Sequence, residues 1–163
     1  MADWRKIRIA AASLTISGAA LVGVAVRENY RQVAYLPTPH DVPTLGFGAT
    51  RGVKPGDTTT PVRALVRLQA DVGAVERALH TTACIGAVPL AQNEWDAYVS
   101  LAYNIGPRAF CHSTLAALLR KQPPDYTGAC KQILRWDKQA GRTLTGLTRR
   151  RQAEYRQCMG DAP

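Results

Sequence analysis

The stretch ENYRQVAYLPTPHDVPTLGFGAT occupies residues 28–50 and interrupts an otherwise helical sequence. Residues 27–35 continue the helical pattern that precedes them, and the prolines within residues 37–43 then exclude regular helix. Residues 44–50 alternate in polarity and are rich in glycine, which predicts a short hairpin strand. The sequence therefore predicts an α+β domain that is predominantly α-helical, with a small β-hairpin near its start.

The rest of the chain has a mostly helical pattern. Thr60 and Pro61 predict a helix start, because Thr is a good N-cap and Pro favours the first helical position. The helix that follows places apolar side chains on one stripe, at Leu65, Leu68, Val72, Val75 and Leu79. Further helices are expected over residues 90–104, directly after Ser113, over 126–136 and over 147–158, with a loop at 141–146. Trp95 and Trp136 are expected in the core.

The N-terminal residues 9–26 read IAAASLTISGAALVGVAV and carry no charge. As a helix, this run is about 27 Å long, just short of the hydrocarbon core of a bilayer. The basic residues before it predict a cytoplasmic N-terminus and an exported remainder. Eleven of its eighteen residues are Ala, Gly, Ser or Thr, so such a helix inserts only marginally.

This weak hydrophobicity leaves several interpretations open. The preferred one is a signal-anchor-release helix at residues 1–26, which first spans the membrane and later escapes, followed by a single domain at residues 27–163. A cleaved signal peptide is an alternative, since Gly23-Val24-Ala25 is a tolerable cleavage site. A permanent anchor and a buried soluble helix are the remaining alternatives.

The four cysteines are an even number and lack the spacing of a zinc site. Export to an oxidising compartment makes disulfides plausible, whereas a cytosolic protein would keep four buried thiols. The predicted pairs are Cys84–Cys111, which ties the loop before one helix to the turn after it, and Cys130–Cys158, which fastens the last helix to its neighbour. His40, His80 and His112 are scattered, so neither a metal nor another cofactor is expected.

The chain has 163 residues and a net charge of +9. This balance favours an anionic partner, such as nucleic acid, a membrane surface or the carboxylates of peptidoglycan, although a basic surface also serves solubility alone. No nucleic-acid-binding motif is present, so nucleic acid is not expected as a partner.

Glu28 lies directly after the uncharged segment and before a polar loop. A glycoside hydrolase needs one protonated acid and a group that holds water or stabilises the cation, and Glu28 is a candidate for the acid. Taken alone, a glutamate beside an arginine is more often a solvated surface charge.

From Glu28 onward, the chain resembles the phage-type lysozyme family. ENYRQVAY at residues 28–35 followed by PTLGFGAT at 43–50 resembles the family's catalytic Glu, then Tyr, then a Thr-x-Gly-aromatic-Gly hairpin. Further matches follow in order: PLAQNEWDAYVS (89–100), AYNIG (102–106), FCHSTL (110–115), ACKQILRW (129–136) and GLTRRRQAE (146–154).

The resemblance implies a lysozyme-like fold and an endolysin. Such a muramidase hydrolyses the β-1,4 bond between N-acetylmuramic acid and N-acetylglucosamine, and so lyses the host. The implied partners are peptidoglycan glycan strands and, transiently, the bacterial inner membrane through residues 9–26. The expected protein is a monomer that is tethered to the inner membrane and then periplasmic. A non-catalytic, peptidoglycan-binding module of the same fold is the alternative.

The resemblance also assigns roles to single residues. Glu28 matches the general acid, and Thr44 matches the threonine that helps position the attacking water. Arg149 or Arg150 falls where the family places an arginine near the catalytic glutamate. Asn104 falls where an asparagine lines the cleft wall.

One position departs from the family pattern. Many members have an aspartate six residues before the threonine, where this chain has Thr38 in a loop one residue longer. Asp41 is the only carboxylate in that loop, and it either takes the aspartate's role or caps the turn. Thr38 is a further candidate for orienting water.

Overall fold

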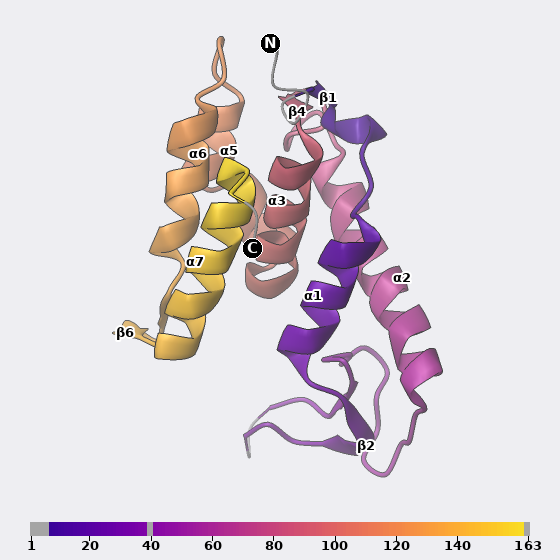
Figure 1. The fold of residues 1–163 in the computed structure, drawn as a ribbon. Helices are drawn as coiled ribbons and strands as arrows, with labels where there is room; N and C mark the ends of the chain where they lie inside the picture. Colours follow the sequence, from indigo (N-terminus) through magenta and orange to yellow (C-terminus); the bar gives the residue numbers. More distant parts are fainter. Residues whose placement is uncertain (1–6, 39–40, 162–163) are drawn as a thin grey trace. The chain divides into compact units, whose positions relative to one another are not determined.

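The computed structural model describes residues 7–38 and 41–161, so His40 lies outside the described residues (Figure 1). The chain forms two compact units. One unit takes in the chain up to Ser17 and again from Val75 onward, and the other is Gly18–Ala74.

The Gly18–Ala74 unit contains the predicted hairpin. Its elements are α1 (Gly18–Glu28), β2 (Arg31–Tyr35), β3 (Thr44–Gly46) and the first part of α2 (Pro61–Leu79). Strands β2 and β3 pair antiparallel, with Tyr35 opposite Thr44. The strand expected within residues 44–50 is therefore confirmed.

The helix expected over residues 27–35 is wrong beyond Glu28. Asn29 has a φ of 55°, a left-handed conformation that ends α1, and the chain then forms β2. Val33 and Tyr35 favour a strand, and pairing with β3 supplies the hydrogen bonds that a helix would have made internally. A short apolar run does not distinguish helix from strand by its spacing alone.

Helix α2 begins at Pro61 as predicted, and the Thr60 hydroxyl accepts a hydrogen bond from the Arg63 amide (3.3 Å). Its buried stripe includes four of the five expected residues, but Leu65 is 41% exposed. Ala64 takes the inner position instead, because a Cβ at Gly46 would lie only 2.8 Å from the Ala64 Cβ. Strand β3 thus packs so closely on α2 that only a small residue fits.

The other unit is built around one buried helix. Its elements after α2 are β4 (Pro89–Leu90), α3 (Gln92–Ile105), α4 (Pro107–Cys111), α5 (Thr114–Leu119), α6 (Tyr126–Gln132), η3 (Ile133–Arg135), β5 (Lys138–Gln139), β6 (Arg142–Thr143) and α7 (Thr145–Met159). Helix α3 packs against α7 and is buried over residues 94–102 (Figure 1). Trp95 is fully buried there, which confirms its place in the core, whereas Trp136 is half-buried.

Two local expectations in this unit have different outcomes. The Ser113 hydroxyl accepts a hydrogen bond from the Ala116 amide (3.2 Å) and caps α5, as predicted. The loop expected at 141–146 is wrong, because Arg142–Thr143 pairs with Lys138–Gln139 in a small hairpin and α7 already begins at Thr145. Ala140 and Gly141, with φ of 49° and 78°, are the two left-handed residues of that hairpin turn.

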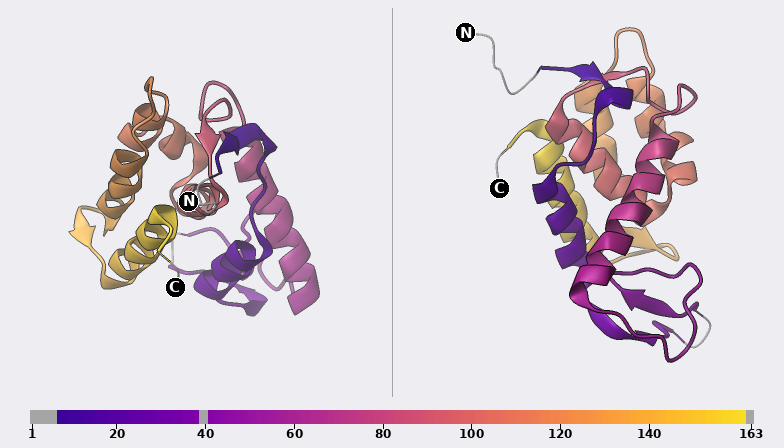
Figure 2. Two further views of the ribbon diagram at one scale, coloured as in Figure 1. Left: turned by 45° about the horizontal axis from the view of Figure 1, so that its top comes forward. Right: turned by 90° about the vertical axis from the view of Figure 1, so that its right-hand side faces the viewer.

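The N-terminal residues do not form one helix over 9–26 in this structure. Ile9–Ala10 is a strand, β1, that pairs antiparallel with β4, and a 3₁₀ turn, η2 (Ala11–Ser13), follows (Figure 2). Helix α1 begins only at Gly18. The amides of Ala11 and Ala12 donate to the carbonyls of Val88 and Gly86, so their hydrogen bonds are made without a helix.

Among the residues that the structure describes, no helix is both long enough and apolar enough to cross a membrane.

Both predicted disulfide pairs are present: Cys84 is bonded to Cys111, and Cys130 to Cys158. They close loops with sequence separations of 27 and 28 residues. We expect replacement of either pair by serine to lower the free energy of unfolding by about 3.6 kcal/mol in the chain-entropy model. Chemical denaturation of each variant beside the oxidised protein measures this loss. Unfolding midpoints equal to that of the oxidised protein would contradict it.

Candidate active site

Glu28 is the last residue of α1, and its carboxyl group lies against the turn that follows β3. A Cβ built on Gly48 would be 3.2 Å from Glu28 Oε2, which is tighter than most real contacts. Gly48 also has a φ of 81°, so this turn needs glycine for its backbone as well as for room. The hairpin turn therefore approaches the Glu28 carboxyl group with its bare backbone.

Thr44 begins β3 and is only 8% exposed. Its hydroxyl donates to the Val42 carbonyl at 3.2 Å. The ring of Tyr30, two residues after Glu28, lies 5.5 Å from that of Phe47, and the Tyr30 hydroxyl donates to the Thr59 carbonyl at 2.9 Å. These contacts hold the chain after Glu28 onto the hairpin that carries Thr44.

The structure brings Thr38 and Asp41 together in one exposed turn. The Thr38 hydroxyl donates to Asp41 Oδ2 at 3.0 Å, and the Asp41 amide donates to the Thr38 carbonyl at 3.0 Å. The Asp41 carboxylate therefore closes the turn in this conformation. Both residues that are candidates for the family's aspartate thus lie in direct contact with each other.

Asn104, Arg149 and Arg150 belong to the other unit. Asn104 lies on α3 and accepts a hydrogen bond from Arg151 (3.0 Å). Arg150 lies on α7, with its Nε 3.3 Å from Glu154 Oε1. Arg149 is exposed on the same helix.

Arg151 and Glu154 form a fully buried ion pair, with Arg151 Nε 2.9 Å from Glu154 Oε2. The Ser100 hydroxyl donates to Glu154 Oε1 at 2.7 Å. Of the three arginines at 149–151, Arg151 is therefore the one that faces the core from α7. It donates a hydrogen bond to the side-chain oxygen of Asn104.

Sequence reasoning selected Arg149 and Arg150 and missed Arg151. A usable signal was the predicted disulfide, because a bonded Cys158 must face the core. Stepping back along the helix by four and three residues from Cys158 gives Glu154 and then Arg151, the inner face that the structure has.

Comparison with known proteins gives consistent similarities. The phage lysozyme family matches residues 25–154. The chain is 42% identical over 115 residues to an endolysin of Acyrthosiphon pisum secondary endosymbiont phage 1, covering 68% of this chain and 75% of that protein. It is 34% identical over 145 residues to a SAR-endolysin of Pseudomonas phage phiKMV, covering 86% of each.

The fold is also similar to a solved structure, the endolysin from Escherichia coli O157:H7 phage FAHEc1. The TM-score is 0.78 at 28% identity, and the match covers 92% of this chain and 96% of that one. The expected lysozyme-like fold is thereby confirmed. Since the family match extends from α1 to α7, the chain belongs to the phage lysozyme family and is a lysozyme-type glycoside hydrolase that acts as an endolysin.

Proposed function

We propose that this endolysin hydrolyses the β-1,4 bond between N-acetylmuramic acid and N-acetylglucosamine in peptidoglycan, with Glu28 as its general acid. The observation that supports this role is the Glu28 carboxyl group at the end of α1, against the glycine turn of the hairpin. A glycosidase acid must reach the glycosidic oxygen from a rigid element, and a helix end beside a bare backbone turn leaves room for a sugar.

In this mechanism the protonated Glu28 donates its proton to the leaving glycosidic oxygen. Thr44 helps position the attacking water from the first residue of β3. Asp41 supports that water or the developing cation, either directly or through its hydrogen bond with Thr38. Cleavage consumes one water molecule and leaves a new reducing end on N-acetylmuramic acid.

The residues of the other unit support the site in this proposal. Arg149 or Arg150 orients the Glu28 carboxyl group, and Asn104 lines the cleft wall. Arg151 serves as a positioning residue, because it binds the Asn104 side chain at 3.0 Å and is itself fixed by Glu154.

The direct test is a zymogram with purified peptidoglycan, followed by identification of the new reducing ends by mass spectrometry. Clearing with reducing-end N-acetylmuramic acid is the expected result. Reducing-end N-acetylglucosamine would overturn the assigned bond. Binding without clearing would favour the non-catalytic module.

We further propose that residues 1–26 act as a signal-anchor-release segment, which exports the enzyme and tethers it to the inner membrane before release into the periplasm. The uncharged run at 9–26 and the similarity to a SAR-endolysin support this. Helix α1 also leaves Val22 and Val26, one turn apart, 60% and 72% exposed. Apolar side chains on one outer face suit a helix that has also been in lipid.

The tether also keeps the enzyme inactive in this proposal. Glu28 follows Val26 by two residues, so a membrane-spanning segment holds Glu28 at the membrane surface. A long glycan strand does not reach the carboxyl group there, and loss of the membrane potential favours escape and activation.

We expect Ala19→Leu with Gly23→Leu to retain the protein in the membrane and delay lysis, because two leucines strengthen a marginal insertion. The folded enzyme has room for both, since Ala19 is exposed and a Cβ at Gly23 meets no atom within 4 Å. Membrane fractionation and lysis timing measure the effect.

The matched control is Ala70→Leu, which adds an exposed leucine on α2 outside the segment. If the double variant is soluble and lyses cells on schedule, the tether proposal fails. If the soluble wild-type protein begins near Val26 by mass, a cleaved signal peptide replaces it.

A further inference from the structure

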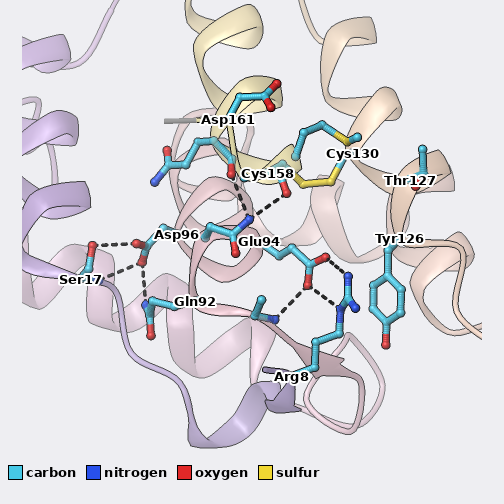
Figure 3. Close-up of a pocket in the computed structure, with 15 residues that line it drawn as sticks. Arg8, Ser17, Gln92, Glu94, Asp96, Tyr126, Thr127, Cys130, Cys158 and Asp161 are labelled. Carbon is cyan, nitrogen blue, oxygen red and sulfur yellow. Dashed lines mark hydrogen bonds and ion pairs between the residues drawn. A yellow bond between two sulfur atoms is a disulfide. The ribbon is translucent and has the colours of Figure 1, made fainter. Parts of the chain in front are cut away.

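Residues 8–17, here called the strap, are held by side chains and carbonyls of the unit that begins again at Val75. Figure 3 shows the two ends of the strap, Arg8 and Ser17, beside a pocket of about 620 Å³. The strap comprises β1, η2 and an extended run up to Ser17. This is the first half of the segment for which the sequence predicts a membrane helix.

Three buried carboxylates receive the strap, and they are here called the receptor: Glu76, Glu94 and Asp96, which are 8%, 4% and 5% exposed. A buried carboxylate is costly unless hydrogen-bond donors satisfy it. Each of the three accepts donors from the strap.

Asp96 binds the C-terminal end of the strap. Ser17 donates twice to it, from its amide to Oδ1 at 2.9 Å and from its hydroxyl to Oδ2 at 2.6 Å (Figure 3). The amide of the preceding residue, Ile16, donates to Glu76 Oε1 at 2.5 Å. Glu76 also accepts the indole N–H of Trp95 at 3.1 Å, which fixes its position in the core.

Glu94 binds the N-terminal end of the strap. Arg8 donates to both of its oxygens, at 2.7 and 3.1 Å, and lies over the ring of Tyr126 at 3.8 Å (Figure 3). The hydrogen bond with Glu94 raises the pKa of Arg8. A bidentate pair of this kind is stronger and more specific than a single contact.

The strap carbonyls are bound as well. Gln92 Nε2 donates to the Thr15 carbonyl at 2.7 Å, and His80 Nε2 lies 2.9 Å from the Leu14 carbonyl oxygen. The His80 ring is stacked on Trp95 with centroids 4.8 Å apart. Leu14 itself is buried, at 7% exposure.

These contacts replace what a membrane helix would lose on leaving the bilayer. In lipid, the amides of residues 9–17 are satisfied only by their own helix. In the docked strap, other acceptors take over. The Ala11 amide donates to the Val88 carbonyl, the Ile16 amide to Glu76 and the Ser17 amide to Asp96. Arg8, which precedes the membrane run and must cross the bilayer during release, acquires a carboxylate and an aromatic face.

We propose that Glu76, Glu94 and Asp96 form a docking site for residues 8–17 of the same chain, and that capture of the strap by this site drives release from the membrane. The inference rests on the proposed anchoring. Because residues 9–26 are weakly hydrophobic, leaving the membrane costs little free energy. Docking of the strap on the receptor then stabilises the released state. The occupant is the chain's own N-terminal segment in its non-helical form.

The first test uses receptor substitutions, which leave the membrane segment unchanged. We expect Asp96→Asn combined with Glu94→Gln to raise the ratio of membrane-bound to soluble protein about tenfold or more, which corresponds to about 1.4 kcal/mol. The matched control is Asp71→Asn on α2, a carboxylate outside the receptor, which should leave the ratio unchanged. A ratio equal to that of the wild type would overturn the role in release.

The second test uses soluble full-length protein and does not depend on anchoring. Trypsin cleavage after Arg8 reports undocking of the strap, and we expect the receptor variant to be cleaved about tenfold faster than the wild type. Thermal unfolding and lytic activity of the same samples verify that the domain is folded. Equal cleavage rates in folded protein would overturn the docking site itself.

The two proposals fail in different ways. A wild-type protein that never enters the membrane fraction refutes the anchoring, while the cleavage test still decides on the receptor. Faster cleavage with an unchanged membrane ratio shows a docking site that does not drive release, and so overturns the proposal.

Discussion

Glu28→Gln is expected to abolish lysis while leaving folding and export intact. Glutamine keeps the shape of the side chain against Gly48 but has no acidic proton that it can transfer to the leaving oxygen. The loss of general acid catalysis alone lowers the rate by about 10²–10⁴-fold. The measurement is clearing of purified peptidoglycan by the purified variant, with circular dichroism to verify the fold.

Asp41→Asn and Thr38→Ala, assayed beside it, show which loop residue takes the place of the family's aspartate. A large loss in Asp41→Asn with near-normal activity in Thr38→Ala assigns a direct role to the carboxylate. Comparable losses in both indicate that their hydrogen bond matters. Near-normal activity of Glu28→Gln would refute the assignment of the acid.

Glu154→Ala should strongly lower the stability of the protein. It removes the carboxylate that forms an ion pair with the fully buried Arg151. Breaking a buried ion pair on one side lowers the free energy of unfolding by about 3–5 kcal/mol. Denaturant titration, monitored by the far-ultraviolet circular dichroism of the helices, measures this loss.

Arg151→Met with Glu154→Leu is the matching double variant, and it should recover most of the loss because both charges of the buried pair are removed together. Arg149→Gln, on the exposed face of the same helix, should change the unfolding midpoint little. A double variant as unstable as Glu154→Ala would show that shape rather than charge governs this position.

Local chemistry made part of the fold predictable. The start of α2 follows from Thr60 and Pro61, and the hairpin follows from the glycines after Thr44. The error at residues 31–35 has a tertiary cause, because pairing with β3 decides the conformation of a short run with mixed preferences. The exposure of Leu65 has a similar cause, since the close approach of Gly46 selects Ala64 for the inner face.

The candidate site was predictable where family resemblance covered it and less so elsewhere. Glu28, Thr44 and Asn104 were selected by their place in matching motifs, and their roles are still predictions. Arg151 could be identified only from its helical spacing relative to Cys158, which faces the core because it is disulfide-bonded. The receptor gave no local signal, because Arg8 and Glu94 are separated by 86 residues and Ser17 and Asp96 by 79.

Those separations set an order of events during synthesis. The strap leaves the ribosome first, and Asp96 follows Ser17 by 79 residues. At about 5–20 residues per second, this delay is roughly 4–16 s. For that time the emerging segment has no docking site to fold against. Under the proposed anchoring, it meets only the translocation machinery and the lipid. If the proposed anchoring holds, the late position of the acceptors in the sequence lets the segment enter the membrane before its docking site has been synthesised.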